Sequence, residues 1–203
     1  MKLVRITRLR AFTVDLEAVA TSTPQAPRLD VSWIQDGRGL EAIDEAAAQD
    51  GERRRLGTMA QHLADSGRIA AVLESGKPVA WQLLRPREQR SFGWLHLLAG
   101  TDAVFSFGVY TVRPWRGRRL FGALSRYSAD FYLKEGSRRM VSLAECGNTA
   151  SLRARQRRGD RPVGWILRLR LPKGLTLVMT DSGLDAGIFS KARPFVYRVR
   201  DSE

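Results

Sequence analysis

The sequence is poor in the residues that build metal sites and covalent cross-links. Its 203 residues include one cysteine, Cys146, and two histidines, His62 and His96. A single cysteine excludes an internal disulfide and any metal site made of several thiolates. Two histidines without motif spacing also disfavour a zinc site built from imidazoles. We therefore expect no metal centre in this protein.

Long apolar runs are absent as well. No stretch approaches the roughly 20 apolar residues that a helix needs to span a bilayer. Arginines interrupt the first residues, where a secretory signal would carry its apolar core. The composition, 43% hydrophobic and 27% charged, is that of a folded soluble protein. We expect a cytoplasmic protein with no membrane partner, an N-terminal extension over residues 1–28 and one domain over residues 29–203.

Positive charge, in contrast, is abundant and unevenly placed. Lysine and arginine number 34 against 21 aspartates and glutamates, a net charge of +13. Residues 113–170 carry +11 of it, and the rest of the chain carries +2. This excess indicates an anionic partner, which is nucleic acid, membrane phosphate or a phosphorylated small molecule. Coding bias is an alternative, because 29 of the 34 cations are arginine.

Hydrophobic periodicity and turn residues predict a mixed α/β (α+β) fold. Apolar alternation predicts strands over 29–35, 68–74, 77–84, 103–112, 139–145, 163–171, 175–180 and 195–200, and helical spacing predicts helices over 40–49, 52–66, 120–135 and 148–159. Residues 1–20 suit a strand or a short helix, Ser75-Gly76 suits a hairpin turn, and residues 85–90 and 181–194 read as loops. Early hairpins followed by crossover helices predict a mixed sheet with helices on both faces.

The densest chemistry lies in residues 112–124, VRPWRGRRLFGAL, where a strand ends, a basic turn follows and a helix begins. Backbone N–H groups at a helix start are unpaired, and the helix dipole favours an anion there. Gly117 allows close approach of a ligand, and Arg116, Arg118 and Arg119 can bind phosphate oxygens. The segment lacks the GK[ST] of a Walker loop and the three spaced glycines of a dinucleotide fingerprint. It predicts a diphosphate site, with an exposed basic turn that caps a helix as the alternative.

This segment resembles the GNAT superfamily of acetyl-CoA-dependent N-acyltransferases. The first motif of that superfamily is carried by Val112, Pro114, Arg116, Gly117, Ala123 and Leu124, and the second by Asn148 and Ser151, with Gly159 closing the following helix. The resemblance implies a mostly antiparallel central sheet with helices on both faces and a CoA-binding core at about residues 103–171. Four positions depart from the pattern. Arg119 and Phe121 stand at small-residue positions, Asp160 replaces a phenylalanine, and Arg155 stands where many members carry a tyrosine that protonates the leaving thiolate.

The resemblance implies an N-acetyltransferase that moves acetyl from acetyl-CoA to a primary amine of a small-molecule or peptide acceptor. It implies CoA contacts by Tyr110, Thr111, Val112, Arg116, Gly117, Arg118, Arg119, Leu120, Phe121, Gly122, Asn148 and Ser151. A strand N–H near Tyr110 or Val112 would polarise the thioester carbonyl. Asn148 would meet the pantetheine arm or hold the neighbouring strand.

Attack by an amine requires a group that removes its proton. Glu145 is the candidate base, because it closes a strand three residues before Asn148 and is the only carboxylate between Glu135 and Asp160. Its alternative role is to neutralise nearby arginines. Tyr110 is the candidate acid, with a place in the core as its alternative.

Two other functions remain open at this point. A nucleic-acid-binding module would use the basic segment, but no aromatic stripe or RNA-binding signature accompanies the arginines. A GNAT-like protein that binds CoA without transferring anything would explain Arg119 and the missing tyrosine. A homodimer is a further expectation, with the strand that begins at Val163 as its edge.

Overall fold

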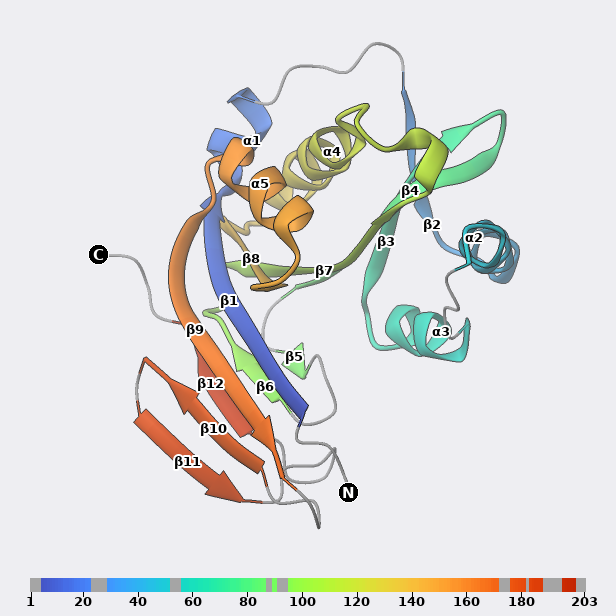
Figure 1. The fold of residues 1–203 in the computed structure, drawn as a ribbon. Coiled ribbons are helices and arrows are strands. Elements are labelled where there is room, and N and C mark those ends of the chain that lie inside the picture. The colour runs from blue at the N-terminus through green and yellow to red at the C-terminus, as the bar shows by residue number, and fades with distance from the viewer. Residues whose placement is uncertain are drawn as a thin grey trace. The chain divides into compact units, whose positions relative to one another are not determined.

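A computed structural model describes residues 5–22, 29–51, 56–86, 89–90, 95–171, 176–181, 183–187 and 195–199. The chain forms two compact units, drawn in one ribbon in Figure 1. The first unit consists of residues 1–14, 87–103 and 141–203, and the second of residues 15–86 and 104–140. The fold class is mixed α+β, with mostly antiparallel strands and helices, as the sequence predicts.

The second unit is built on four antiparallel strands in the order β7-β4-β3-β2. They span Asp30–Ile34 (β2), Arg68–Glu74 (β3), Lys77–Pro86 (β4) and Ala103–Thr111 (β7). Ser75 and Gly76 join β3 to β4 with φ angles of 51° and 77°, the left-handed pair that a two-residue hairpin turn requires. This confirms the predicted hairpin.

Helices cover both faces of these strands. They are α1 (Leu16–Ser22), α2 (Gly37–Gln49), α3 (Leu56–Ala64) and α4 (Leu120–Lys134). Ile43 of α2 and Met59 of α3 share a core with Trp81 of β4. On the opposite face, the ring of Trp33 lies 5.1 Å from that of Tyr127 on α4, centroid to centroid. Because successive side chains of a strand point to opposite faces, this alternation produces the predicted two-sided arrangement.

In the described part of the first unit, strands pair in the order β11-β10-β9-β1-β8. They span Arg5–Asp15 (β1), Arg139–Glu145 (β8), Arg161–Arg170 (β9), Thr176–Thr180 (β10) and Gly183–Gly187 (β11), with helix α5 (Thr149–Arg158) between β8 and β9. A second sheet has the order β12-β6-β5, formed by Phe195–Arg198, Leu95–Leu98 and Gln89–Arg90. The segment expected as an N-terminal extension thus supplies a central strand.

Three sequence expectations need correction. The prediction of a loop over residues 85–90 is wrong, because β4 continues to Pro86 and β5 occupies Gln89–Arg90. The prediction of a loop over residues 181–194 is wrong at β11. This segment has low intrinsic strand propensity, but it forms a strand because it pairs with β10. The strand that begins at Val163 is not a free edge, because β9 pairs with β1 on one side and β10 on the other. It therefore cannot serve as the edge of a dimer.

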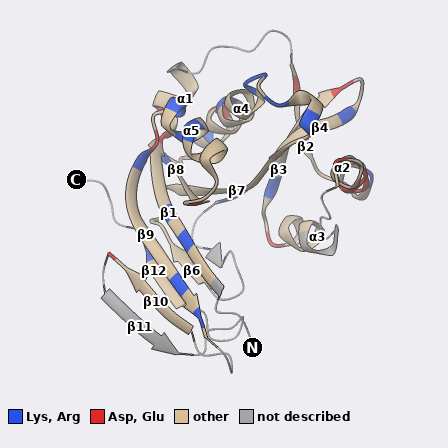
Figure 2. Cartoon of the chain, in the orientation of Figure 1, with Lys and Arg blue, Asp and Glu red and all other residues tan. Residues whose placement is uncertain are grey.

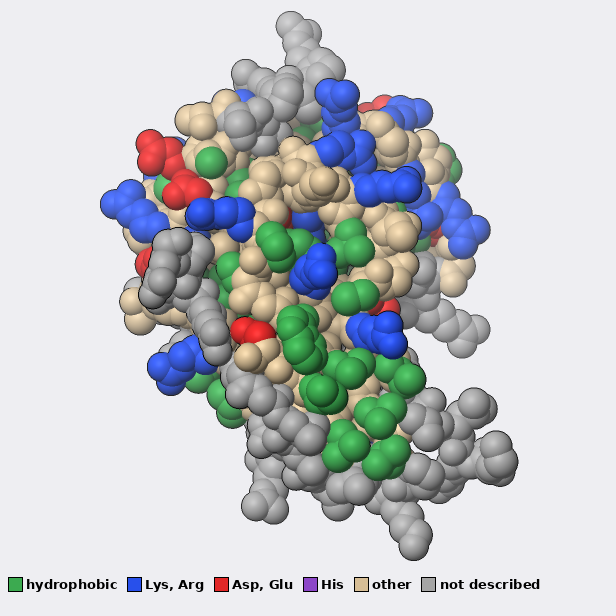
Figure 3. Space-filling view, turned by 60° about the vertical axis from the view of Figure 1, so that its left-hand side comes forward, with side chains coloured by type: hydrophobic (Ala, Val, Ile, Leu, Met, Phe, Trp, Pro, Cys, Tyr) green, Lys and Arg blue, Asp and Glu red, His purple; other side chains and the backbone are tan. Residues whose placement is uncertain are grey.

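The surface of the molecule is basic in many places. Figure 2 shows lysine and arginine on helices and strands of both units. Figure 3 shows hydrophobic side chains gathered over part of one face, and the large exposed ones in the first unit include Ile6, Trp165, Met179 and Val196. Among the described helices, none is both long and apolar enough to cross a membrane.

Candidate functional site

The loop predicted to bind a diphosphate lies in the second unit, between β7 and α4. After β7 ends at Thr111, a short 3₁₀ helix, η1, spans Arg113–Trp115, with Pro114 at its start. The backbone N–H of Arg116 closes this turn on the carbonyl of Arg113 at 3.1 Å. Gly117 follows with φ = +82°, and a Cβ placed there would meet no atom within 4 Å. The loop is therefore open to solvent at the position where close approach was predicted.

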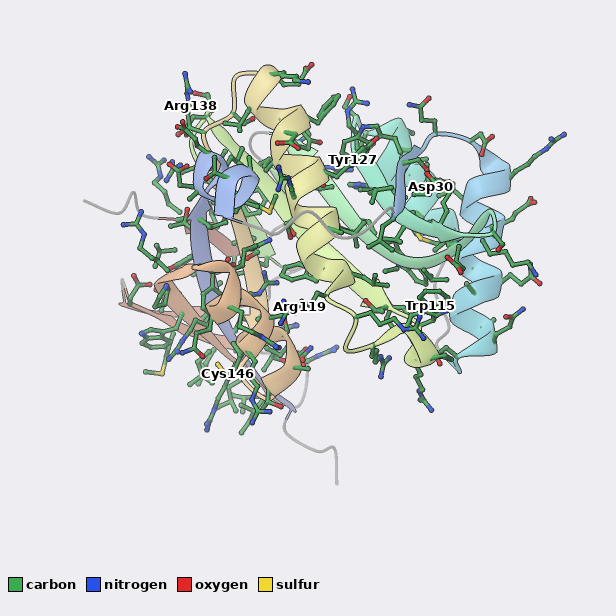
Figure 4. The ribbon with its side chains drawn as sticks, turned by 90° about the horizontal axis from the view of Figure 1, so that it is seen from above. Asp30, Trp115, Arg119, Tyr127, Arg138 and Cys146 are labelled. Atoms are coloured by element: carbon green, nitrogen blue, oxygen red, sulfur yellow. The ribbon has the colours of Figure 1, made fainter. Side chains whose placement is uncertain are left out.

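Arg119 adopts the left-handed conformation, with φ = 59° and ψ = 23°, immediately before α4. A residue with a Cβ pays about 1–2 kcal/mol in that region. Its side chain makes no capping bond, whereas its carbonyl accepts the N–H of Gly122 at 3.0 Å. Figure 4 shows Arg119 at the N-terminal end of α4. The departure from glycine thus leaves the turn in place at the cost of backbone strain.

The amides that open α4 are available to a ligand. Within the described part of the chain, the backbone N–H groups of Gly117, Arg118, Arg119 and Leu120 have no hydrogen-bond acceptor. Leu120 begins α4, a helix of 15 residues whose dipole places partial positive charge at this end. Four such amides at a helix start are the kind of donor set that favours an anion.

The three arginines of the loop point in different directions. The Arg118 guanidinium stacks on the Trp115 ring, 4.3 Å from its centroid, and the Arg119 side chain is exposed. Arg116 instead folds back onto β7, where its Nε donates to the Thr111 carbonyl at 3.0 Å. Arg118 and Arg119 are therefore exposed beside the amides that have no acceptor, whereas Arg116 forms a hydrogen bond that stabilises the loop.

The end of β7 directs its hydrogen bonds to two edges. A strand N–H near Tyr110 or Val112 was expected to face a thioester carbonyl, but the Val112 N–H already donates to the Val79 carbonyl of β4 at 3.0 Å. Because N–H groups alternate between the two edges of a strand, the Thr111 N–H points to the edge away from β4. Among these residues, Thr111 rather than Val112 can therefore offer a donor at that edge.

The Tyr110 hydroxyl, considered above as a proton donor, is engaged by Asp50. It donates to Asp50 Oδ2 at 2.5 Å, and its buried ring lies 5.0 Å from that of Trp81. The same carboxylate oxygen accepts the backbone N–H of Arg113 at 3.0 Å. Burial raises the pKa of Asp50, but hydrogen bonds from Tyr110 and Arg113 and the neighbouring guanidinium groups outweigh it, so the pKa lies below its usual value.

Sequence reasoning did not identify Asp50. In the sequence, Asp50-Gly51 reads only as the end of a helix, and Gly51 has φ = 77°. Nothing local links Asp50 to a tyrosine 60 positions later. Beside it lies an open pocket of about 410 Å³, lined by Ala42, Glu45, Ala46, Gln49, Asp50, Lys77, Pro78, Val79, Val112, Pro114 and Trp115.

The second predicted motif lies in the first unit, where Asn148 caps α5. Its Oδ1 accepts the Ser151 N–H at 3.0 Å, and Gly159 ends the helix with φ = 85°. This agrees with the helix expected over 148–159 and with Gly159 as its end. Glu145 ends β8 with an exposed side chain, and its carbonyl accepts the Asn148 N–H at 2.9 Å. Cys146 is exposed, and its N–H donates to the Arg8 carbonyl of β1 at 2.9 Å.

Arg155 is buried in the first unit. Its guanidinium donates to Ser142 Oγ at 2.7 Å and to the Leu143 carbonyl at 3.1 Å, both on β8. Asp160 lies 3.7 Å from it and accepts two bonds of 2.6 Å from Arg158. Burial, followed by repulsion from Arg158, lowers the pKa of Arg155 to about 10. The two departures from the superfamily pattern, Arg155 and Asp160, thus form one buried ion cluster.

No group of three or more histidine, cysteine, aspartate or glutamate side chains suited to a metal occurs among the residues that the structure describes.

Comparisons with known proteins identify the fold. No protein-family model matches the sequence, and no curated protein matches it. Solved structures do. A GCN5-related N-acetyltransferase from Kribbella flavida is 18% identical, with a TM-score of 0.54 over 84% of this chain and 61% of that chain. A GNAT-family acetyltransferase from Colwellia psychrerythraea is 14% identical, with a TM-score of 0.57 over 83% and 56%.

A third solved structure is an aminoglycoside N-acetyltransferase in complex with CoA, 19% identical, with a TM-score of 0.51 over 64% of this chain and 90% of that chain. The chain spans only 62%, 49% and 63% of three other solved chains that it matches. At these identities the comparisons concern the fold. The chain has the fold of GNAT-family acetyltransferases.

Proposed function

We propose that this protein is an acyltransferase that moves acetyl from acetyl-CoA to a primary amine of a small-molecule or peptide acceptor. The observation that carries the proposal is the loop before α4, where four consecutive residues, among them the open Gly117, have backbone N–H groups without an acceptor. That donor set suits a diphosphate. The fold is that of acetyltransferases, one of which was solved with CoA.

The diphosphate of acetyl-CoA would be held by the amides of residues 117–120, with Arg118 and Arg119 adding charge; the Gly122 N–H is used within the turn. The acyl thioester supplies a carbonyl that an amine can attack. The Thr111 N–H is the strand donor that we assign to this carbonyl, since the N–H of Val112 is used within the sheet. Asn148 has its Oδ1 engaged by Ser151, so its Nδ2 is the atom that we assign to the pantetheine arm.

We assign the removal of the amine proton to Glu145, whose carboxylate is exposed at the end of β8. Tyr110 is the proposed acid, which would protonate the CoA thiolate as the C–S bond breaks. Because its proton is directed at Asp50, Tyr110 can donate elsewhere only after this bond opens. The structure also favours a second candidate, a protein that binds CoA without transfer, because the position expected to carry a tyrosine holds the buried Arg155.

Calorimetric titration with CoA and acetyl-CoA tests the proposal. We expect wild type to bind both, and Arg118→Glu combined with Arg119→Glu to weaken binding at least about tenfold, because repulsion replaces attraction at the phosphates. Arg153→Glu combined with Arg157→Glu is the matched control, since it reverses two exposed arginines of α5. A wild type that ignores acetyl-CoA at millimolar concentration contradicts both candidates.

Thiol release with a panel of amines separates the two candidates. Transfer predicts release that is reduced about 10²–10⁴-fold in Glu145→Gln, the range for loss of a general base. Equal release by the variant and wild type would show that Glu145 is not the base. Binding without release from any amine supports the second candidate.

A further inference from the structure

We propose that Asp50 is a positioning residue that holds the β7–α4 loop in the conformation that receives the diphosphate of acyl-CoA. The inference rests on the proposed function, because it concerns the same loop. Asp50 follows the last residue of α2 and lies 63 positions before Arg113, the first residue of η1. Its carboxylate thus connects two elements that are far apart in the sequence.

The carboxylate accepts from both sides of the turn. Oδ2 receives the Tyr110 hydroxyl at 2.5 Å, at the end of β7, and the Arg113 N–H at 3.0 Å, at the start of η1. The guanidinium groups of Arg113 and Arg116 each lie 3.6 Å from a carboxylate oxygen. One side chain therefore holds the end of the strand and the first N–H of the turn, and it pairs with the charges of two arginines.

Burial indicates that the carboxylate is the fixed partner in this arrangement. The Asp50 side chain is 9% exposed, whereas those of Arg113 and Arg116 are 70% and 53% exposed. Exposed arginines can exchange partners with water at little cost. Removing an acceptor that a buried hydroxyl and a backbone N–H share is costly. Loss of Asp50 therefore removes one hydrogen bond from Tyr110 and one from the start of the loop together.

Asp50 does not act as the proton carrier. Its hydrogen bonds favour the ionised form, which remains an acceptor across the neutral pH range. Arg116, which Asp50 faces, also donates to the Thr111 carbonyl, so the network extends to the strand residue whose N–H is assigned to the thioester. Loss of Asp50 would therefore disturb the loop that receives the diphosphate and, less directly, the end of β7.

Asp50→Ala, Asp50→Asn and Tyr110→Phe test the inference, with Asp65→Asn as the matched control. Asp65 is an aspartate of the same unit that forms a 3.0 Å ion pair with Arg85, away from the loop. The measurements are CoA affinity by calorimetry, hydrogen exchange of the amides over residues 112–119, and the kcat and KM for acetyl-CoA.

We expect Asp50→Ala to raise the Kd and KM for CoA ligands at least about tenfold, to speed exchange over 112–119, and to raise KM by a larger factor than it lowers kcat. Asp50→Asn keeps the shape and an acceptor oxygen, so its effect is expected to be smaller. Tyr110→Phe is expected to speed exchange less than Asp50→Ala, because the bond to Arg113 stays. Asp65→Asn is expected to change none of these values.

Unchanged exchange and a Kd within twofold of wild type in Asp50→Ala would overturn the inference. So would a loss of thermal stability with an unchanged Kd, since that result assigns Asp50 a structural role alone. A wild type that binds no CoA would instead overturn the proposed function, while the exchange measurement would still report whether Asp50 holds the loop.

Discussion

Not every arginine of this chain adds to the charge of its surface, as Arg155 and Arg158 show. Both side chains are almost fully buried and share Asp160. Arg113 and Arg116 lie beside Asp50. Four of the fourteen arginines in residues 113–170 thus face internal carboxylates. Part of the +11 that indicated an anionic partner serves the fold, and Arg118 and Arg119 are the part nearest the proposed diphosphate.

His62 predicts a pH dependence of stability. It is 4% exposed, its Nε2 donates to the Arg68 carbonyl at 3.1 Å, and burial lowers its pKa below 6.5. The unfolded chain therefore takes up the proton first, so this contribution is fully present above about pH 6.5 and is lost as the pH falls below it. We expect a slope of up to about 1.4 kcal/mol per pH unit in urea unfolding between pH 6.5 and the folded pKa.

The control for His62 lies within the same chain. His62→Gln is expected to remove most of this pH dependence, whereas His96→Gln is expected to retain it. An unchanged slope in His62→Gln would assign the effect to other groups. The pKa values of Asp50 and Asp65 are lowered from 3.8, so these two carboxylates titrate below this window.

At the scale of elements, local signals predicted most of the architecture. Leu120–Lys134, Arg139–Glu145 and the cap at Asn148 follow the expected bounds closely, because helical spacing, capping residues and turn glycines act over a few positions. β11 was missed, since Gly183–Gly187 is a strand only through pairing with β10. The first residues of the helix expected over 52–66 lie outside the described residues, which resume at Leu56.

The start of α4 predicts a gain of stability on substitution. Arg119→Gly removes a left-handed strain of about 1–2 kcal/mol and adds about 0.5–1 kcal/mol of unfolded-state entropy. We expect a net gain of about 0.5–1 kcal/mol, or an increase of about 1–4 °C in Tm. Arg118→Gly is the control, because Arg118 has no positive φ, and it is expected to lower Tm. The same Arg119→Gly protein is expected to bind CoA more weakly, since it loses a cation.

A Tm for Arg119→Gly equal to or below that of Arg118→Gly would show that the left-handed residue is not strained. Strain at a position that also contacts ligand is common in proteins. A higher Tm together with weaker CoA binding in Arg119→Gly would indicate that the backbone strain at Arg119 is retained because its side chain contributes to binding.

At the scale of the whole molecule, net charge separates the proposed enzyme from a nucleic-acid-binding module. A module that neutralises several phosphates loses affinity steeply with salt. We expect a labelled single-stranded oligonucleotide to bind the +13 protein weakly and to dissociate by about 0.2 M salt, while CoA binding persists. Fluorescence anisotropy and calorimetry at matched salt measure the two. Oligonucleotide affinity that exceeds CoA affinity at 0.2 M salt would favour the nucleic-acid function.

The homodimer stays a prediction, which light scattering can test.

The sequence by itself determined most of the helices and strands and the position of the basic loop at residues 112–119. Those properties arise from the spacing of apolar residues, from Pro114 and Gly117, and from caps that contact residues three positions away. Only the tertiary structure decided which groups face one another. Asp50 accepts a hydrogen bond from Tyr110, 60 positions later in the sequence. Arg155 is buried against β8, and the Val112 N–H donates to β4. Such pairings depend on how strands and helices are brought together, and no short-range pattern encodes them.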